Sequence, residues 1–191
     1  SVALPEDVPV IMLPGRPTSW KGHKILLEAL SKIVDKKFIC LMVGAADGTK
    51  SFVASLTDQG QRLGLEGRFR LTQSSTDMPA ALMVSDVVVM PSITPEPFGR
   101  VALEAQAMGR PIIAFNHGGA KESVIHKETG WLVTPSDAGQ LAQAVREAIS
   151  LTSRKRNKMA KRAREHILQN FSTEIMCRKT FEVYLRLLNK V

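Results

Sequence analysis

Few cysteines and no long hydrophobic run set the first limits on this sequence of 191 residues. Its two cysteines lie in unlike surroundings, Cys40 in an apolar, strand-like run and Cys177 in a late helical segment. We therefore expect no structural disulfide, and a reducing compartment such as the cytoplasm is favoured. No stretch approaches the roughly 18–20 apolar residues that span a bilayer. The first residues also lack the basic and apolar segments of a secretory signal.

Positive charge is in surplus, with a formal net charge of +8. Much of it lies in one short segment that contains Arg154, Lys155, Arg156, Lys158, Lys161, Arg162 and Arg164. No aromatic residues interleave with these cations, so no nucleic-acid partner is expected. Two interpretations stay open. The segment is either a solvated helix face or a surface attracted to an acidic acceptor or anionic lipid, which would place the protein peripherally at the inner face of a membrane.

Short β-rich runs alternate with helical patterns as far as about residue 150. The predicted strands cover residues 8–13, 38–43, 69–71, 87–90 and 112–115, with a sixth candidate at 131–133. Apolar residues at helical spacing predict helices at 25–34, 52–63, 78–84 and 101–108, and from residue 137 onward the pattern is helical. This alternation predicts an α/β fold, a doubly wound Rossmann-like parallel sheet with helices on both faces and further helices at the C-terminus.

The loops that follow the predicted strands carry the residues suited to ligand binding. Ligands of an open parallel sheet bind beyond the carboxyl ends of its strands. Glycines, hydroxyl residues and charges gather there, in the segments 15–16, 44, 72–75, 91–99 and 116–119. Glycine lets backbone N–H groups approach a ligand, and the helix N-termini that follow favour anions. This layout predicts a ligand that contains phosphate; the alternative is that the glycines only make turns.

Two pairs of charged residues lie in these loops. Arg16 and Lys21 are five positions apart, close enough for both to reach one diphosphate, with each charge-assisted hydrogen bond contributing about 1.5–3 kcal/mol. The carboxylates of Glu96 and Glu104 suit the hydroxyl groups of a sugar and a ribose, which are hydrogen-bond donors. An acid/base pair of a hydrolase is the alternative for the glutamates, although no water-activating partner accompanies them. Solvated surface side chains are the alternative for both pairs.

The four histidines indicate no metal site, because no two of them have the spacing of metal ligands. His117 precedes Gly118 and Gly119, and it is either a ligand contact or a simple loop residue. The other three are expected on helix or turn surfaces: His23, His126 and His166.

At these residues the chain resembles the large GT-B family of retaining glycosyltransferases, which includes many bacterial enzymes of lipopolysaccharide and capsule synthesis. The resemblance extends over nearly the whole chain, and the combination of motifs is specific. The matching stretches are Gly15-Arg16-x4-Lys21-Gly22, Glu96-Pro97-Phe98-Gly99-x4-Glu104, Gly109-x-Pro111, Gly118-Gly119-x2-Glu122 and the Thr-Gly-Trp-Leu-Val run at 129–133.

The resemblance implies roles for particular residues. Arg16 and Lys21 would neutralise the diphosphate of the leaving nucleotide without a metal or other cofactor, and Glu96 would contact hydroxyls of the donor sugar. The other implied donor contacts are Glu104 at the ribose, Thr72, Ser74, Ser75 and Met78 near the base, and the loop residues Gly15, Gly44, Phe98, Gly99, Arg100, Gly118 and Gly119. The implied donor is a nucleotide-diphosphate sugar, linked to UDP or GDP. The implied acceptor is a glycan or a lipid-linked molecule of the cell envelope.

The resemblance also divides the chain. Residues 1–170 would form the nucleotide-sugar-binding domain, the C-terminal half of a GT-B fold, and residues 171–191 a helix that crosses back to an N-terminal acceptor domain absent from this chain. Donor binding without useful turnover is therefore expected. A non-catalytic nucleotide-sugar-binding or membrane-docking module and a relative of nucleotide-sugar epimerases remain the alternatives.

Overall fold

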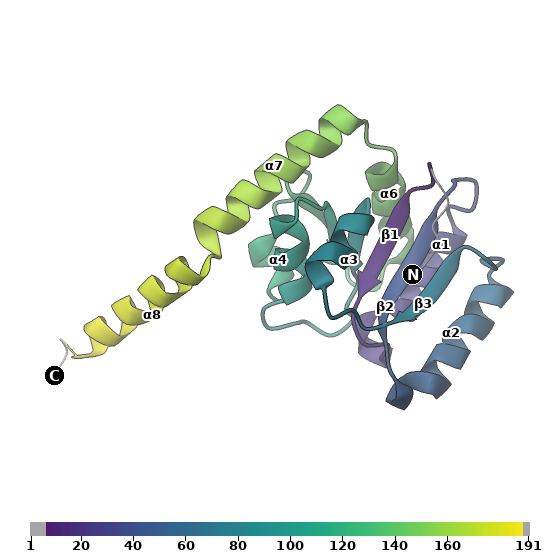
Figure 1. Cartoon of the computed structure of the whole chain (residues 1–191), viewed down its shortest axis with the longest axis horizontal. Helices are drawn as coiled ribbons and strands as arrows, with labels where there is room; N and C mark the ends of the chain where they lie inside the picture. The colour runs from purple at the N-terminus through teal and green to yellow at the C-terminus, as the bar shows by residue number, and fades with distance from the viewer. Residues whose placement is uncertain (1–6, 189–191) are drawn as a thin grey trace.

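A computed structural model describes residues 7–188 and shows a twisted sheet of six strands with helices on both faces (Figure 1). Every pair of neighbouring strands is parallel, and the order across the sheet is β3-β2-β1-β4-β5-β6. The strands are β1 (Val10–Pro14), β2 (Ile39–Ala45), β3 (Phe69–Gln73), β4 (Val87–Met90), β5 (Ile112–Phe115) and β6 (Gly130–Val133). The order reverses between β1 and β4, and the predicted doubly wound Rossmann-like fold is confirmed.

The helices follow the strands in the predicted alternation. They are α1 (His23–Ser31), α2 (Lys50–Arg62), α3 (Met78–Val84), α4 (Arg100–Ala107), α5 (Ala120–Ser123), α6 (Ala138–Ile149), α7 (Ser153–Asn170) and α8 (Thr173–Leu188), with two 3-10 turns, η1 (Ser19–Lys21) and η2 (Asp47–Thr49). The predicted strand ends lie within two residues of the observed ones. The sequence did not indicate α5, η1 or η2, because elements this short contain no repeat of apolar spacing.

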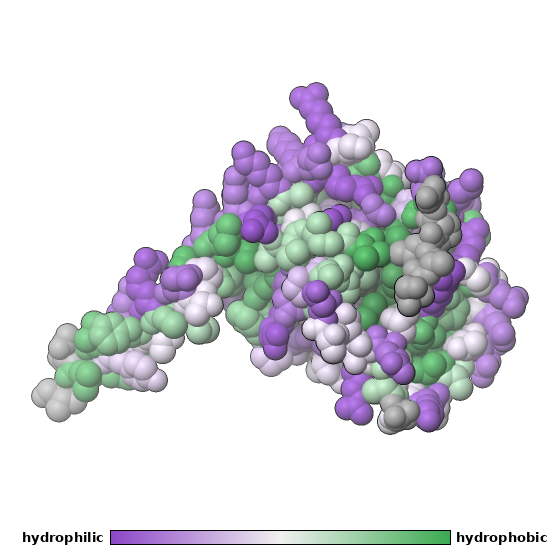
Figure 2. Space-filling view, in the orientation of Figure 1, coloured by the Kyte–Doolittle hydropathy of each residue, from purple (hydrophilic) through white to green (hydrophobic). Residues whose placement is uncertain are grey.

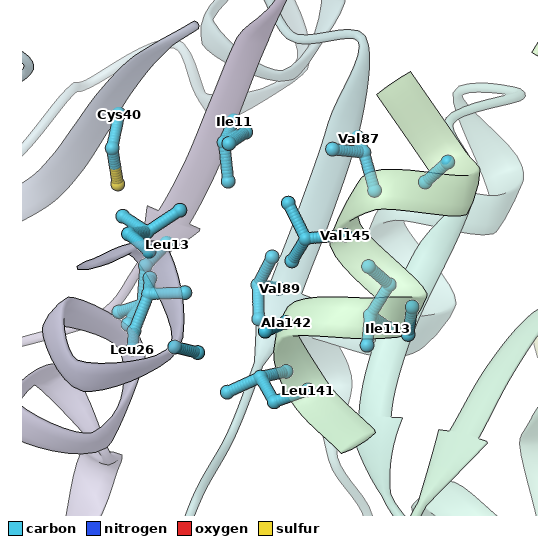
Figure 3. Packing of buried hydrophobic residues seen from close by; sticks show 14 of the residues in the cluster. Ile11, Leu13, Leu26, Cys40, Val87, Val89, Ile113, Leu141, Ala142 and Val145 are labelled. Carbon is cyan, nitrogen blue, oxygen red and sulfur yellow. The ribbon is translucent and has the colours of Figure 1, made fainter. Parts of the chain in front are cut away.

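The core has two layers, one on each face of the sheet. Alternate side chains of a strand point to opposite faces, so Ile11 and Leu13 of β1 join the layer beneath α1 and α6, whereas Met12 joins the layer beneath α3 and α4. Figure 3 shows the first layer, in which strand side chains meet Leu26 of α1 and Val145 of α6. Burial on both faces explains why the central strands read as continuous apolar runs.

The basic helix α7 is tied to the body by some of its own cations. Arg156 forms an ion pair with Asp86, whose carboxylate also accepts the backbone N–H of Val10 at 2.7 Å. Arg162 pairs with Glu128 at 3.2 Å, and Arg164 donates to the carbonyl oxygen of Ala107 at 2.6 Å. Part of the positive charge of this segment, for which a solvated helix face was one of the two interpretations, therefore holds α7 against the sheet and α4.

The last helix, α8, leaves the body of the molecule (Figure 1) and has no buried residue. Its apolar side chains give the green surface at that end of Figure 2; among the exposed ones are Met176, Phe181, Tyr184, Leu185 and Leu188. Within residues 7–188, no helix is both long and apolar enough to cross a membrane.

Candidate functional site

A pocket of about 560 Å³ lies at the edge of the sheet where the carboxyl ends of β1, β2 and β3 meet α3 and α4. Seven of the predicted site residues line it: Gly15, Arg16, Gly44, Ser74, Ser75, Met78 and Glu104. Four residues without a predicted role complete the lining: Pro14, Val43, Ala46 and Val101. The pocket lies beside the reversal in strand order, where open α/β sheets bind their ligands.

Lys21 and Glu96 form an ion pair next to this pocket. The ammonium nitrogen of Lys21 lies 2.8 Å from Oε1 of Glu96 and 4.3 Å from the centre of the Trp20 ring. Both charged side chains are mostly enclosed, at 17% and 14% exposure. The hydroxyl group of Ser92, itself buried, donates to the same carboxylate oxygen. The cation predicted for a diphosphate and the carboxylate predicted for a sugar therefore lie in contact, although 75 residues separate them in the sequence.

Glu104 lies on α4 and forms an exposed pair with Arg100, with 3.0 Å between Oε1 and the guanidinium nitrogen. Arg100 is 81% exposed, and a surface pair of this kind contributes little to stability. The Glu104 carboxylate keeps lone pairs for further donors. It is thus a lining group of the pocket that can accept hydrogen bonds from a ligand hydroxyl.

The two glycines after β5 pack against the loop that carries Glu96. The backbone N–H of Gly119 donates to the carbonyl oxygen of Glu96 at 2.9 Å. A Cβ atom at Gly119 would lie 2.3 Å from the carbonyl oxygen of Phe98, so no larger residue fits. His117 is tied to the same region, with Nε2 2.8 Å from the carbonyl oxygen of Ser92. These contacts from the loop after β5 hold the loop between β4 and α4 in place.

The structure places the remaining predicted residues outside the lining of the pocket. Thr72 lies half-buried near the end of β3, Gly99 is the N-cap of α4, and Phe98 is 55% exposed. In all, eight predicted residues do not line the pocket: Lys21, Thr72, Glu96, Phe98, Gly99, Arg100, Gly118 and Gly119. Within the described residues, no group of three His, Cys, Asp or Glu residues could hold a metal ion.

His23 corrects one expectation from the sequence. It was expected at a helix surface, but it is fully buried at the start of α1, edge-on to Phe52, and in the described part of the chain neither ring nitrogen has a hydrogen-bond partner. Burial lowers the pKa of His23 to about 4; the charge of Lys21 adds to the shift, and the backbone of Gly15 opposes it. The signal was present in the sequence, because His23 shares one helix face with Leu26, Leu27 and Leu30.

Acid is expected to destabilise the fold through His23. The unfolded ring binds a proton near pH 6.5 but the folded ring only near pH 4. The unfolded state therefore takes up more protons between these values, and stability falls by about 3 kcal/mol as the pH decreases. Urea unfolding of the chain and of His23→Leu across this range measures the effect, which the variant should largely lose. His166→Asn is the matched control and should keep most of it, and equal pH profiles for the chain and His23→Leu would refute the assignment.

The fold and the pocket together define a class of protein. The molecule is a Rossmann-like α/β domain with a pocket at the carboxyl edge of its sheet, lined by glycine loops, Arg16 and Glu104, and with the Lys21–Glu96 ion pair beside it. The family model "Glycosyl transferases group 1" matches residues 1–166. The chain belongs to this family of glycosyltransferases, and its fold is that of a GT-B C-terminal domain.

Three relatives illustrate the match. D-inositol 3-phosphate glycosyltransferase of Mycobacterium tuberculosis is 32% identical over 176 residues, which cover 91% of this chain and 36% of that protein. A glycosyltransferase from Rickettsia africae ESF-5 superposes with a TM-score of 0.91 at 37% identity, over 98% of this chain and 50% of that one. Anabaena Alr3699/HepE, solved with UDP-glucose, gives a TM-score of 0.85 at 32% identity, over 94% of this chain and 49% of that one. The chain thus spans half or less of the length of these relatives.

Proposed function

We propose that this chain is the donor-binding domain of a retaining glycosyltransferase that takes a UDP- or GDP-linked sugar. The observation that carries the proposal is the meeting of Arg16 and Glu104 in one pocket, with the Lys21–Glu96 pair beside it. The Anabaena protein, solved in complex with UDP-glucose, supports a nucleotide sugar as the ligand. The family match favours sugar transfer over the epimerase and non-catalytic alternatives.

Each part of the site has a role in this proposal. Glu104 accepts hydrogen bonds from the ribose hydroxyls, and Ser74, Ser75 and Met78, which line the same pocket, border the base. Arg16 faces the diphosphate from the loop after β1. Glu96 contacts the sugar hydroxyls, and the backbone of the loop from Pro97 to Arg100 contacts the sugar and phosphates.

The proposed chemistry is electrostatic. Negative charge grows on the diphosphate as the bond to the sugar breaks, and fixed cations stabilise that charge without reorganising. Lys21 supplies one such cation, held in place by Trp20 and Glu96 before the donor arrives. This arrangement keeps the partly buried ammonium group paired before an anion binds and leaves it beside the pocket when an anion enters.

The acceptor side belongs to the proposal as well. We infer that residues 1–170 act with an N-terminal domain outside this chain, which holds a glycan or lipid-linked acceptor of the bacterial cell envelope. The exposed apolar side chains of α8 suit a helix that packs against that domain. In this proposal the whole enzyme works in the cytoplasm, and the chain alone binds donor without turnover.

Calorimetric titration with UDP, GDP and ADP tests the proposal. One nucleotide should bind with a Kd on the order of 10 μM to 1 mM, as a half-site allows. Glu104→Gln should weaken the binding of that nucleotide about tenfold, since the substitution removes a charged hydrogen-bond acceptor that contributes about 1.5 kcal/mol. The same variant should leave pyrophosphate binding unchanged, because pyrophosphate has no ribose.

Glu28→Gln is the control, since Glu28 lies exposed on α1 and does not line the pocket. Binding of none of the three nucleotides to the wild-type chain would count against the proposal. If Glu104→Gln weakened the binding of nucleotide and of pyrophosphate equally, the assignment of Glu104 to the ribose would be wrong.

A further inference from the structure

A second pocket, of about 760 Å³, lies away from the candidate donor site and shares no lining residue with it. It is formed where the start of β6 meets the end of α6 and the start of α7. Its lining includes Lys127, Trp131, Glu147, Leu151, Lys155, Lys158, Met159 and Arg162. None of these residues has a role in donor binding, so a ligand of this pocket does not depend on the proposed function.

The charges around this pocket are not balanced. Four cations line it, together with two carboxylates, Glu128 and Glu147, which both have partners within the protein. Glu128 pairs with Arg162 at 3.2 Å, and Glu147 accepts the indole N–H of Trp131 at 3.0 Å. Lys155 and Lys158 form no ion pair within the described part of the chain, unlike the neighbouring arginines of α7 that hold the helix in place. Their positive charge is therefore available to a ligand.

The four cations lie around one concave pocket and are not spread over a convex surface. Lys155, Lys158 and Arg162 are spaced by three and four residues, which places them on one side of α7. Figure 2 shows the hydrophilic side chains along the helix in this region. Lys127 lines the same pocket from the turn before β6, where its backbone adopts the left-handed conformation, with φ of +63°. Few non-glycine residues do so, and such positions cluster at binding sites.

The floor of the pocket is apolar. Met159 and Trp131 are buried at its base, and Leu151 is half-buried beside them. A concave apolar floor with a few convergent charged groups is the usual build of a small-ligand site. A free inorganic ion would use only the lysines, whereas a phosphate ester would use the lysines and the floor together.

We propose that this pocket binds a phosphate ester, with Lys155 and Lys158 on the phosphate and the apolar floor beneath the group that carries it. The phosphate belongs to either a small soluble ester or the headgroup of an anionic phospholipid, since the two share this chemistry. Cationic side chains near such a membrane surface contribute attraction additively.

The two tryptophans of the chain allow each site to be observed separately. Trp131 lies in this pocket and Trp20 lies beside the candidate donor site. In ¹⁵N-labelled protein, phenyl phosphate should move the indole N–H signal of Trp131, because its partner Glu147 lies beside the bound anion. Lys155→Gln/Lys158→Gln should weaken that response at least tenfold and leave any Trp20 response unchanged.

The matched control is Arg154→Gln/Lys161→Gln, which removes the same charge from the same helix outside the pocket and should retain the response. Vesicles of phosphatidylglycerol, compared with vesicles of phosphatidylcholine, distinguish the two sources of the phosphate, a phospholipid headgroup and a soluble ester. Selective broadening of Trp131 by the anionic vesicles identifies a lipid headgroup, and a response to phenyl phosphate without one to vesicles identifies a soluble ester. No response of Trp131 to either probe, or equal losses in both double variants, would overturn the proposal.

Discussion

Replacing Gly22 with alanine is expected to lower the free energy of unfolding by about 2–5 kcal/mol. Gly22 joins η1 to α1 with φ of +77°, where a residue with a side chain costs about 1–2 kcal/mol. The new methyl carbon would also lie 1.8 Å from the carbonyl oxygen of Pro91. That atom belongs to the backbone after β4 and moves only with the loop that carries Glu96. Urea unfolding measures the loss.

Gly64→Ala is the matched control for this prediction. Gly64 has a similar φ of +69°, but a Cβ atom there would meet nothing within 4 Å. Its loss of stability should therefore be only about 1–2 kcal/mol, the backbone contribution alone. The Gly22 variant should also bind nucleotide more weakly, because the displaced loop carries Glu96. Equal losses of stability in the two variants would show that the close approach to Pro91 is not significant.

Replacing Lys21 with methionine is expected to weaken the binding of the preferred nucleoside diphosphate by about 10- to 100-fold, the equivalent of about 1.5–3 kcal/mol. Methionine keeps an unbranched apolar side chain but removes the ammonium group that lies over the Trp20 ring. The binding of the nucleoside, which has no phosphate, should not change. Calorimetric titration with both ligands measures the difference.

Lys24→Met serves as the control, because Lys24 lies only three positions further along the chain, on α1, is exposed, and does not line the pocket. It should bind the diphosphate as the unaltered chain does, apart from a small change in long-range attraction. Undiminished binding in Lys21→Met would mean that Lys21 serves only to balance Glu96. A similar loss in both variants would indicate general electrostatic attraction instead of a contact at the diphosphate.

Much of the fold could be predicted from local patterns. The apolar runs at 87–90 and 112–115 match β4 and β5, because strands buried on both faces have no polar positions to obscure their limits. The glycine and hydroxyl residues after the strands gather at one edge, since parallel strands all end there. Sequence alone could not indicate α5 or the 3-10 turns, which are shorter than one period of a recognisable pattern.

The candidate site was predicted in composition but not in arrangement. Glu104 and Arg16 line one pocket, whereas Lys21 lies against Glu96 and Phe98 faces solvent. Ser92 lies in the loop segment 91–99 that was predicted to suit ligand binding, yet only its contact with Glu96 gives it a role. From the sequence, its hydroxyl group could cap a helix, bind a ligand or face solvent, and the spacing of the residues does not distinguish these three roles.

The sequence by itself determined the class of fold, the edge of the sheet that carries the candidate site, and the membership of the family. These depend on periodic burial and on motifs within short segments, which neighbouring residues specify. Only the tertiary structure decided that Lys21 meets Glu96, and that the turn before β6 and the start of α7 enclose a second pocket. Such contacts join segments far apart in the chain, because strand order and register determine which loops become neighbours.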